Sequence, residues 1–377
     1  MPAITAFING RVLGERGFED GLTVLVEQGR IVEVRSGAAP GATEVIDLHG
    51  GYLVPGFIDT QVNGGGDVLF NDAPTVEGLR RIAAAHRKFG TTGLMPTLIS
   101  DDVAVMRHAI AAVREAITQG VPGILGIHLE GPYLAAARKG VHDPARFHTP
   151  DDDELDLVAS LGVGRTMLTL APERFDADTL RALAARGVLL CAGHTAASYE
   201  QLRDAFGAGV RGVTHLFNAM TPLGSREPGA VGAALDDPDS WCGLIVDGHH
   251  VHAAALRVAI AAKPRGRMML VTDAMPPVGG VRHDFGLYGV TMTCRDGRCS
   301  TADGTLAGSA LDMASAVRNT ANLGIALDEA CRMASTYPAQ FLGLDGELGH
   351  IAPGYRADLV ALDDDLQVWG SWIAGEG

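Results

Sequence analysis

From residue 55 onward the chain alternates short apolar runs with segments of helical spacing, and this alternation limits the possible folds most strongly. Segments such as 76–89, 103–118 and 253–262 have the spacing of amphipathic helices. Eight repeated strand and helix units predict an α/β fold with a closed (β/α)8 TIM barrel, with an open doubly wound sheet as the structural alternative. The eight apolar runs are 56–62, 92–97, 123–130, 166–171, 188–194, 212–215, 242–247 and 268–273.

The two ends of the chain have a different pattern. Short strand-like runs fill the N-terminal part, with Asn9-Gly10 and Gln28-Gly29 as hairpin signals. After residue 310 two helical segments, 312–322 and 327–341, precede a tail that returns to strands. We therefore expect a small discontinuous β-sandwich domain formed by both termini beside a catalytic barrel domain. The expected limits are 1–54 with 345–377 for the β-sandwich and 55–344 for the barrel.

Four of the apolar runs end in a side chain that can bind a metal ion or a proton. The endings are Glu130, His194, His215 and Asp273. In a parallel barrel the carboxyl ends of the strands converge on one face, so these four side chains should meet there. Glu130, His194 and His215 make a suitable three-ligand set for a catalytic divalent metal ion with one position open for water.

A metal ion in this set would give the site hydrolytic chemistry. Zinc or a similar ion lowers the pKa of bound water from ~15.7 toward 7 and polarises a carbonyl oxygen. Asp273 would take the water proton and later pass it to a leaving group. A lone buried histidine at a strand end is more often a core residue, but the coincidence with Glu130 and Asp273 favours ligands. Together these residues predict hydrolysis of an amide or ester-like bond.

Three of the segments that follow predicted strands are longer than the other such segments. We expect them to be loops that bind the substrate. They are 133–152, 221–237 and 276–303. Within the third, Cys294 and Cys299 flank a predicted hairpin turn and could be neighbours. The five cysteines are an odd, scattered set that does not resemble a secreted disulfide framework, and we interpret them as structural.

The overall charge argues against polyanionic partners. The formal net charge is -15, which gives no electrostatic attraction for nucleic acid or an anionic membrane. The N-terminus lacks a charged leader followed by an apolar core, and no apolar run approaches the ~20 residues of a membrane span. We therefore expect a cytoplasmic protein that holds any anionic ligand by local contacts.

Short motifs along essentially the whole chain resemble a known family. They are Pro55-Gly56-Phe57-Ile58-Asp59, Gln61-Val62-Asn63-Gly64, His128-Leu129-Glu130-Gly131-Pro132, Gly193-His194-Thr195, Thr214-His215-Leu216-Phe217-Asn218-Ala219-Met220, Asp247-Gly248-His249-His250, Val271-Thr272-Asp273-Ala274 and Leu306-Ala307-Gly308-Ser309. In this order they resemble the N-acetylglucosamine-6-phosphate deacetylase family of the amidohydrolase superfamily. Several of the motifs are specific to the deacetylases rather than to the superfamily.

The resemblance implies hydrolysis of the N-acetyl group of N-acetyl-D-glucosamine 6-phosphate to D-glucosamine 6-phosphate and acetate. It implies the same barrel, β-sandwich and metal ligands, with Asp273 as the catalytic acid and base. By similarity, His142 would contact the acetamide carbonyl and Arg226 would bind the phosphate. His250 would be a second phosphate contact that reaches the neighbouring site of a homodimer. The other substrate contacts implied are Val141, Asn218, Ala219, Leu306, Ala307 and Gly308.

One motif departs from the superfamily pattern. Many amidohydrolases carry His-x-His at the end of the first strand for a second metal ion, whereas this chain has Gln61-Val62-Asn63. Because neutral amides are poor metal ligands compared with imidazole, we predict one tight site per subunit. Zinc is the expected ion, with iron, cobalt, manganese or cadmium as possibilities.

Two other functions stay open. The chain could deacetylate N-acetylgalactosamine 6-phosphate or hydrolyse another N-acyl compound, since contacts to the sugar 4-hydroxyl cannot be read from the sequence. It could also be a catalytically idle sugar-phosphate sensor. A sensor would not need a general base beside a metal site, so the retention of Asp273 argues against that alternative.

Overall fold

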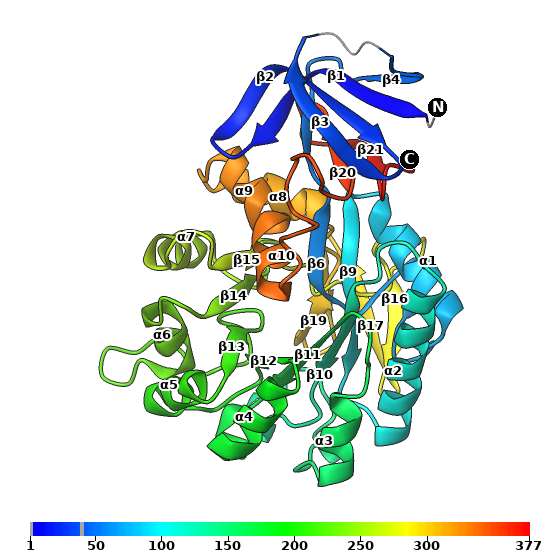
Figure 1. Cartoon of the computed structure of the whole chain (residues 1–377). Coiled ribbons are helices and arrows are strands. Elements are labelled where there is room, and N and C mark those ends of the chain that lie inside the picture. The colour runs from blue at the N-terminus through cyan, green and yellow to red at the C-terminus, as the bar shows by residue number, and fades with distance from the viewer. Residues whose placement is uncertain (1–2, 38–40) are drawn as a thin grey trace. The chain divides into compact units, whose positions relative to one another are not determined.

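The computed structural model describes residues 3–37 and 41–377, which divide into two compact units (Figure 1). Of these residues, one unit comprises 3–37, 41–59, 86–93 and 313–377, and the other comprises 60–85 and 94–312. The domain limits inferred from the sequence stay a prediction.

An eight-stranded parallel sheet confirms the predicted TIM barrel. Its strands follow one another in sequence order, and each lies on one of the eight apolar runs. Beyond the last strand Val62 pairs with Ala274, and the Asp273 N–H donates to the Gln61 carbonyl at 3.0 Å, so the first and last strands close the ring. The strands are β6 (Phe57–Val62), β9 (Thr91–Ile99), β10 (Gly126–Glu130), β11 (Arg165–Leu170), β12 (Val188–Ala192), β13 (Val210–Val213), β14 (Trp241–Leu244) and β15 (Met268–Leu270).

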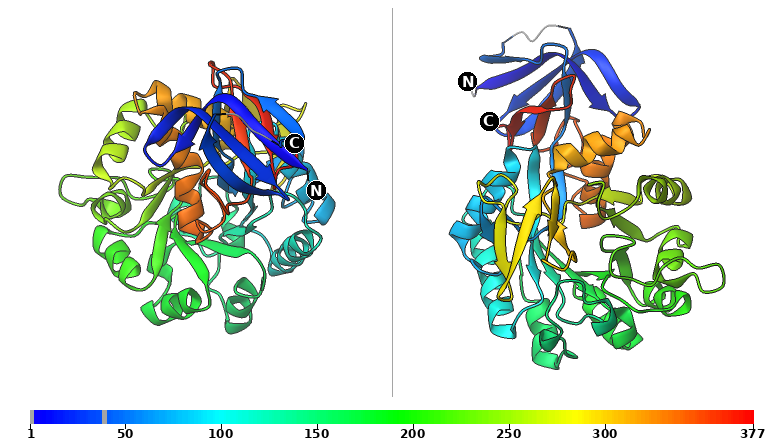
Figure 2. Two further views of the ribbon diagram at one scale, coloured as in Figure 1. Left: turned by 45° about the horizontal axis from the view of Figure 1, so that its top comes forward. Right: turned by 180° about the vertical axis from the view of Figure 1, so that it is seen from behind.

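Helices lie around the outside of this strand ring (Figure 2). In α2 (Val103–Thr118) the buried residues Met106, Ile110 and Val113 recur with helical spacing and form the face turned to the strands. Ser198 and Gln201 form a capping box at the start of α5 (Tyr199–Gly207). The other helices of this region are α1 (Val76–Arg87), α3 (Asp152–Val158), α4 (Ala177–Ala185), α6 (Gly229–Asp236) and α7 (Ala253–Ala262), with short 3-10 turns at Ala136–Arg138, Pro144–Arg146 and Pro172–Arg174.

Two of the three segments expected to be loops contain regular structure, so that part of the prediction was wrong. The segment 221–237 contains α6, whose small residues are almost all buried and give little amphipathic signal. The segment 276–303 contributes three strands to a four-stranded antiparallel sheet. Those strands are β16 (Asp284–Leu287), β17 (Val290–Arg295) and β18 (Arg298–Ser300), and they pair onward to β19 (Leu306–Ser309).

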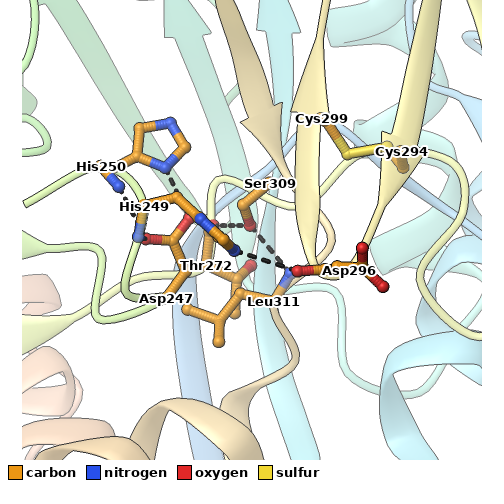
Figure 3. The surroundings of a disulfide bond; sticks show 9 residues. All are labelled: Asp247, His249, His250, Thr272, Cys294, Asp296, Cys299, Ser309 and Leu311. Carbon is orange, nitrogen blue, oxygen red and sulfur yellow. Dashed lines mark hydrogen bonds and ion pairs between the residues drawn. A yellow bond between two sulfur atoms is a disulfide. The ribbon is translucent and has the colours of Figure 1, made fainter.

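Cys294 and Cys299 lie directly opposite each other in the β17 and β18 hairpin and form a disulfide (Figure 3). The turn between the strands is Asp296-Gly297, with φ of 50° and 80°, which fits the two-residue turn typical of such hairpins. The two cysteines are therefore neighbours, as the sequence suggested. They pack in an apolar cluster with Ile99 and Met275.

The other unit contains a seven-stranded sheet that both termini build, as the sequence predicted. Phe7, Ile31, Leu53 and Leu359 are among the residues of its core. The path through the sheet is β21-β20-β5-β1-β2-β3, and β4 pairs with β1. The strands are β1 (Ile4–Gly14), β2 (Gly17–Glu27), β3 (Arg30–Ser36), β4 (Glu44–Asp47), β5 (Tyr52–Pro55), β20 (Leu359–Leu362) and β21 (Val368–Trp372).

Of the two hairpin turns predicted in this sheet, one is present and the other is not. Gln28-Gly29 is the turn between β2 and β3, as predicted. Asn9-Gly10 instead lies inside β1 at a shift of register, so its prediction as a hairpin was wrong. Asn9 has φ of 57°, and a Cβ at residue 10 would lie 2.5 Å from Leu48, so the dipeptide forms a bulge that accommodates a close contact.

Three helices complete this unit: α8 (Met313–Asn322), α9 (Leu327–Ala334) and α10 (Thr336–Leu342). The sequence predicted a single helical segment at 327–341, but Ser335 interrupts it with a φ of -136°. A two-stranded ribbon of β7 (Gly64–Gly65) and β8 (Val68–Leu69) lies in the barrel unit. Across residues 3–37 and 41–377, none of the helices has the length and apolar character needed to cross a membrane.

Candidate active site

A cavity of about 240 Å³ at the carboxyl ends of the barrel strands contains all four of the predicted strand-end residues. They stand at or just after the carboxyl ends of β10, β12, β13 and β15, and the barrel brings these strand ends to one face, so residues up to 143 positions apart in sequence share one site. The lining residues are Asn63, Ile99, Glu130, Gly140, Val141, His142, His194, His215, Asn218, Ala219, His250, Asp273, Met275, Thr305, Leu306 and Gly308.

Glu130, His194 and His215 form a compact cluster of possible metal ligands. One ligand atom from each lies within 4.8 Å of the others, and all three side chains are buried. The Nε2 atom of His215 is 3.0 Å from Oε1 of Glu130 and 3.1 Å from Nε2 of His194. Two imidazole nitrogens and one carboxylate oxygen are the ligand types found in catalytic zinc sites.

The orientation of His194 fits a metal ligand. Its Nδ1 lies 2.8 Å from the carbonyl oxygen of Arg138. A carbonyl oxygen only accepts, so Nδ1 carries a hydrogen, and Nε2 is the ring nitrogen that faces Glu130 and His215. Fixing the ring of a ligating histidine by a hydrogen bond at its other nitrogen is typical of metal sites. The residues of the cluster therefore fit a divalent cation.

The electrostatics of the cluster also favour a cation. Burial alone would raise the pKa of Glu130, but hydrogen bonds with His194 and His215 hold it well below its usual range. Burial lowers the pKa of His215, but the hydrogen bond and charge of Glu130 raise it by more. Glu130 is therefore a buried anion that requires positive charge beside it.

Asp273 lies next to this cluster with its carboxylate held by amide groups. Its Oδ1 accepts hydrogen bonds from Nδ2 of Asn63 at 2.6 Å and from Nε2 of Gln61 at 3.1 Å. Gln61 also donates to Glu130 at 3.2 Å. Burial and the negative charge of Glu130 raise the pKa of Asp273 to about 6. A carboxyl group with a pKa near neutrality is suited to accept a proton and then return it.

The backbone at three of these residues has an uncommon conformation. His194, His215 and Asp273 have φ of 47°, 34° and 53°. Positive φ is rare for residues other than glycine, and such conformations cluster at functional sites where the surroundings hold them. Each of the three residues follows the end of its barrel strand, where the chain turns sharply into the cavity.

The substrate contacts inferred from the resemblance are mostly placed on this cavity. Val141, His142, Asn218, Ala219, His250, Leu306 and Gly308 line it. Ala307, between two lining residues, packs instead in the apolar cluster around the disulfide. Arg226 lies exposed on the loop before α6 and is not among the lining residues. Their contacts with substrate stay predictions.

His250 lines the cavity of its own chain, and its Nδ1 lies 2.6 Å from Oδ2 of Asp247 (Figure 3). The preceding His249 turns the other way, and its Nε2 lies 3.0 Å from the carbonyl oxygen of Asp296 in the hairpin turn (Figure 3). The expectation that His250 reaches a neighbouring subunit stays a prediction.

Two buried polar residues near the cavity were missed at the sequence level. Ser100 follows β9, and its Oγ is 2.8 Å from Nδ1 of His142. His128, two positions before Glu130, lies between the hydroxyl groups of Thr97 at 3.0 Å and Thr169 at 2.7 Å. Burial lowers the pKa of His128 to about 4, so it is neutral. A polar residue directly after a barrel strand was a usable signal for Ser100.

Three comparisons place the chain among known proteins. Residues 52–375 match the sequence profile of the Amidohydrolase family. The chain is 46% identical over 330 residues to an N-acetylgalactosamine-6-phosphate deacetylase of Shewanella sp. (strain ANA-3), covering 87% of this chain and 84% of the relative.

Two solved structures are similar to this chain over nearly its whole length. The N-acetylglucosamine-6-phosphate deacetylase from Pasteurella multocida has a TM-score of 0.96 and 35% identity, with 99% of both chains covered. A mutant of the enzyme from Mycobacterium smegmatis, in complex with N-acetyl-D-glucosamine-6-phosphate, has a TM-score of 0.91 and 34% identity. That comparison covers 100% of this chain and 98% of the other.

Proposed function

The chain belongs to the amidohydrolase family, and we propose that it hydrolyses the N-acetyl group of N-acetyl-D-glucosamine 6-phosphate to give D-glucosamine 6-phosphate and acetate. The proposal rests on one observation: Asp273 lines the same cavity as the cluster of Glu130, His194 and His215. The relatives described above are named as deacetylases of N-acetyl amino sugar 6-phosphates, which supports the substrate class.

We infer that Glu130, His194 and His215 hold one divalent cation, with zinc as the first choice for two nitrogen donors and one oxygen donor. Such a cation, when bound, supplies a Lewis acid that polarises the acetamide carbonyl and makes a water molecule more acidic. Gln61 and Asn63 are engaged as hydrogen-bond donors to carboxylates, which supports a single site rather than two.

The proton transfers fall to Asp273. As a carboxylate it accepts a proton from the attacking water, and as an acid it returns that proton to the amide nitrogen when the carbon–nitrogen bond breaks. Its pKa of about 6 makes both states accessible near neutral pH. We infer that His142, which lines the same cavity, donates a hydrogen bond to the carbonyl oxygen as that oxygen gains negative charge.

The phosphate requires a cation or several hydrogen-bond donors. His250 supplies an imidazole on the cavity wall, and Arg226 on the exposed loop before α6 carries the guanidinium that suits a phosphate monoester. We infer a homodimer and a cytoplasmic location from the resemblance and from the sequence, and both stay predictions.

Acetate release from N-acetylglucosamine 6-phosphate by the zinc-loaded protein tests the proposal. The unphosphorylated sugar is run beside it as the control for the phosphate contacts. Rapid release from the phosphorylated sugar, with no release from the unphosphorylated one, supports both the proposed reaction and the proposed phosphate contacts. A metal-loaded protein that releases no acetate from any of these sugars would overturn the proposed reaction.

N-acetylgalactosamine 6-phosphate is the second candidate substrate. The observation in its favour is the 46% identity to a deacetylase of that sugar, compared with 36% identity to the N-acetylglucosamine-6-phosphate deacetylase of Haemophilus influenzae. The two sugars differ only in the orientation of the 4-hydroxyl group, and both present the same acetamide. The ratio of kcat/KM for the two epimers decides between them.

A further inference from the structure

The cavity of the active site has one apolar side. Ile99, Val141 and Met275 line it, and all three belong to or pack against the apolar cluster around the Cys294–Cys299 disulfide. Ile99 is 2% exposed and Met275 is 1% exposed, so solvent hardly reaches these two side chains. We call Ile99 and Met275 the apolar wall of the cavity.

The apolar wall is held firmly in place. The Nδ2 atom of Asn71 donates to the Ile99 carbonyl oxygen at 2.8 Å, and its Oδ1 accepts from the Ile99 N–H at 3.1 Å. The Met275 N–H donates to the Ser309 carbonyl oxygen at 2.9 Å. A Cβ added at Gly308 would lie 2.7 Å from Cγ of Met275, so the methionine side chain packs directly against the main chain there. A wall packed in this way leaves little room for extra atoms.

The carbonyl carbon of an N-acyl sugar carries three groups, and the proposed function accounts for two of them. The oxygen faces the proposed metal site and His142, and the nitrogen, which carries the sugar, faces Asp273. The acyl methyl group remains. Met275 follows Asp273 by two residues. Ile99 precedes Ser100, whose Oγ lies 2.8 Å from Nδ1 of His142. The apolar wall therefore adjoins both positions and offers the methyl group an apolar surface against which it is removed from water.

We propose that Ile99 and Met275 determine the acyl specificity of this protein: they receive the methyl group of an N-acetyl amide and exclude longer acyl chains. The inference rests on the proposed function and adds to it the class of amide that the site accepts. An apolar pocket discriminates by about 10- to 200-fold against a substrate with one extra methylene group. The selectivity for acetyl comes from the shape of the wall and needs no charge or hydrogen bond.

The kcat/KM values of the zinc-loaded, full-length protein for a series of N-acyl amino sugar 6-phosphates test the proposal. The series is N-formyl, N-acetyl, N-propionyl and N-butyryl on the preferred sugar epimer. The wild-type value should fall about 10- to 200-fold from acetyl to propionyl. Met275→Ala and Ile99→Ala should each raise the ratio of propionyl to acetyl about tenfold above the wild-type ratio. Similar wild-type values for the acetyl and propionyl sugars would overturn the proposal.

Two further variants separate the wall from general loosening of the core, and the comparison of ratios cancels the intrinsic reactivities of the amides. Met292→Ala is the matched control, because Met292 is 2% exposed in the same apolar cluster but is not among the residues that line the cavity. It should keep the wild-type ratio of propionyl to acetyl. Ile99→Phe enlarges the wall and should raise the ratio of formyl to acetyl. A gain for propionyl in Met292→Ala equal to that in Met275→Ala would contradict the proposal.

Binding to Asp273→Asn reads the wall without turnover. In that background Met275→Ala should tighten the Kd of the propionyl sugar relative to the acetyl sugar about fourfold, the effect of one buried methylene group, as measured by titration calorimetry. An equal change of Kd for both sugars would overturn the proposal. Failure of the proposed function is distinguishable, because it would appear as a metal-loaded wild-type protein that releases no acetate. Acetate release with the same acyl ratios in all variants would leave the function standing and reject the role of the wall.

Discussion

The Nδ2 atom of Asn63 lies 2.6 Å from Oδ1 of Asp273, and both side chains are buried in the barrel. The same oxygen accepts a second hydrogen bond, from Gln61 at 3.1 Å. These two amides stand where many amidohydrolases carry a pair of histidines. In this chain they hold one oxygen of the Asp273 carboxylate in place.

Asn63→Leu tests this relationship. The hydrogen bond of Asn63 lowers the pKa of Asp273, so its loss should raise that pKa and move the acidic limb of kcat/KM to higher pH. A hydrogen bond to a charged group contributes ~1.5–3 kcal/mol, which corresponds to about one to two pH units. The measurement is kcat/KM against pH at full metal occupancy. Asn322→Leu, at the end of α8, is the control. Its kcat/KM should fall at the same acidic pH as that of the wild-type protein.

The wild-type pH profile has a predicted direction. Only the carboxylate of Asp273 can accept a proton, so activity should fall as pH drops through its pKa, which burial and Glu130 raise to about 6. A cation at the neighbouring cluster favours the carboxylate and can only shift this limb downward. We therefore expect the limb at or below pH 6. A limb well above pH 6 in the metal-loaded protein would argue against Asp273 as the base.

Asp273→Asn removes the base while keeping the shape of the side chain. The cluster of Glu130, His194 and His215 is intact in this variant, so metal content should stay at the wild-type level. Turnover should fall by about 100- to 10,000-fold, the usual contribution of a general acid or base. Metal analysis and acetate release on the same sample separate the two effects, and near-normal turnover would refute the role.

The strand-end residues could be predicted because their position follows from a local pattern. Glu130, His194 and His215 each follow an apolar run, and the barrel then brings the ends of the runs together. The bond between Asn63 and Asp273 could not be predicted in the same way. It joins residues 210 positions apart and depends on how the first strand closes against the last.

The other features that the sequence analysis predicted wrongly or missed have local physical explanations. The helix α6 lacks an apolar and a polar face, because most of its residues are small and buried. The strands β16 to β18 alternate buried and exposed residues over short stretches rich in Gly, Asp and Arg, which gave them the composition of a loop. Ser100 was overlooked because a single serine carries no periodic signal.

Removal of the metal ion should affect both stability and activity. Without a cation, Glu130 remains a buried charge whose side-chain partners are two histidines and Gln61. Chelation should therefore lower the melting temperature and abolish acetate release. Zinc at about 100 times its Kd should restore ~2.7 kcal/mol of folding free energy. Thermal unfolding with and without zinc measures this. Glu130→Gln is the control, and an equal zinc effect in that variant would place the ion elsewhere.

Arg226→Ala tests the phosphate contact. Arg226 is exposed on the loop before α6, so its removal should leave the fold and the metal cluster unchanged. If its guanidinium binds the phosphate in the ground state and the transition state alike, KM should rise while kcat is largely kept. The loss of a hydrogen bond to a charged group predicts about a ten- to hundredfold rise. Arg211→Ala, at an exposed arginine of β13, is the control.

The unphosphorylated sugar distinguishes a phosphate contact from a general effect on the loop. Its kcat/KM should be the same for Arg226→Ala and the wild-type protein, because it lacks the group that the guanidinium binds. An equal loss for both sugars would mean that the arginine shapes the loop instead. In that case His250, which already lines the cavity, would be the main phosphate contact, and His250→Ala should then show the selective rise in KM.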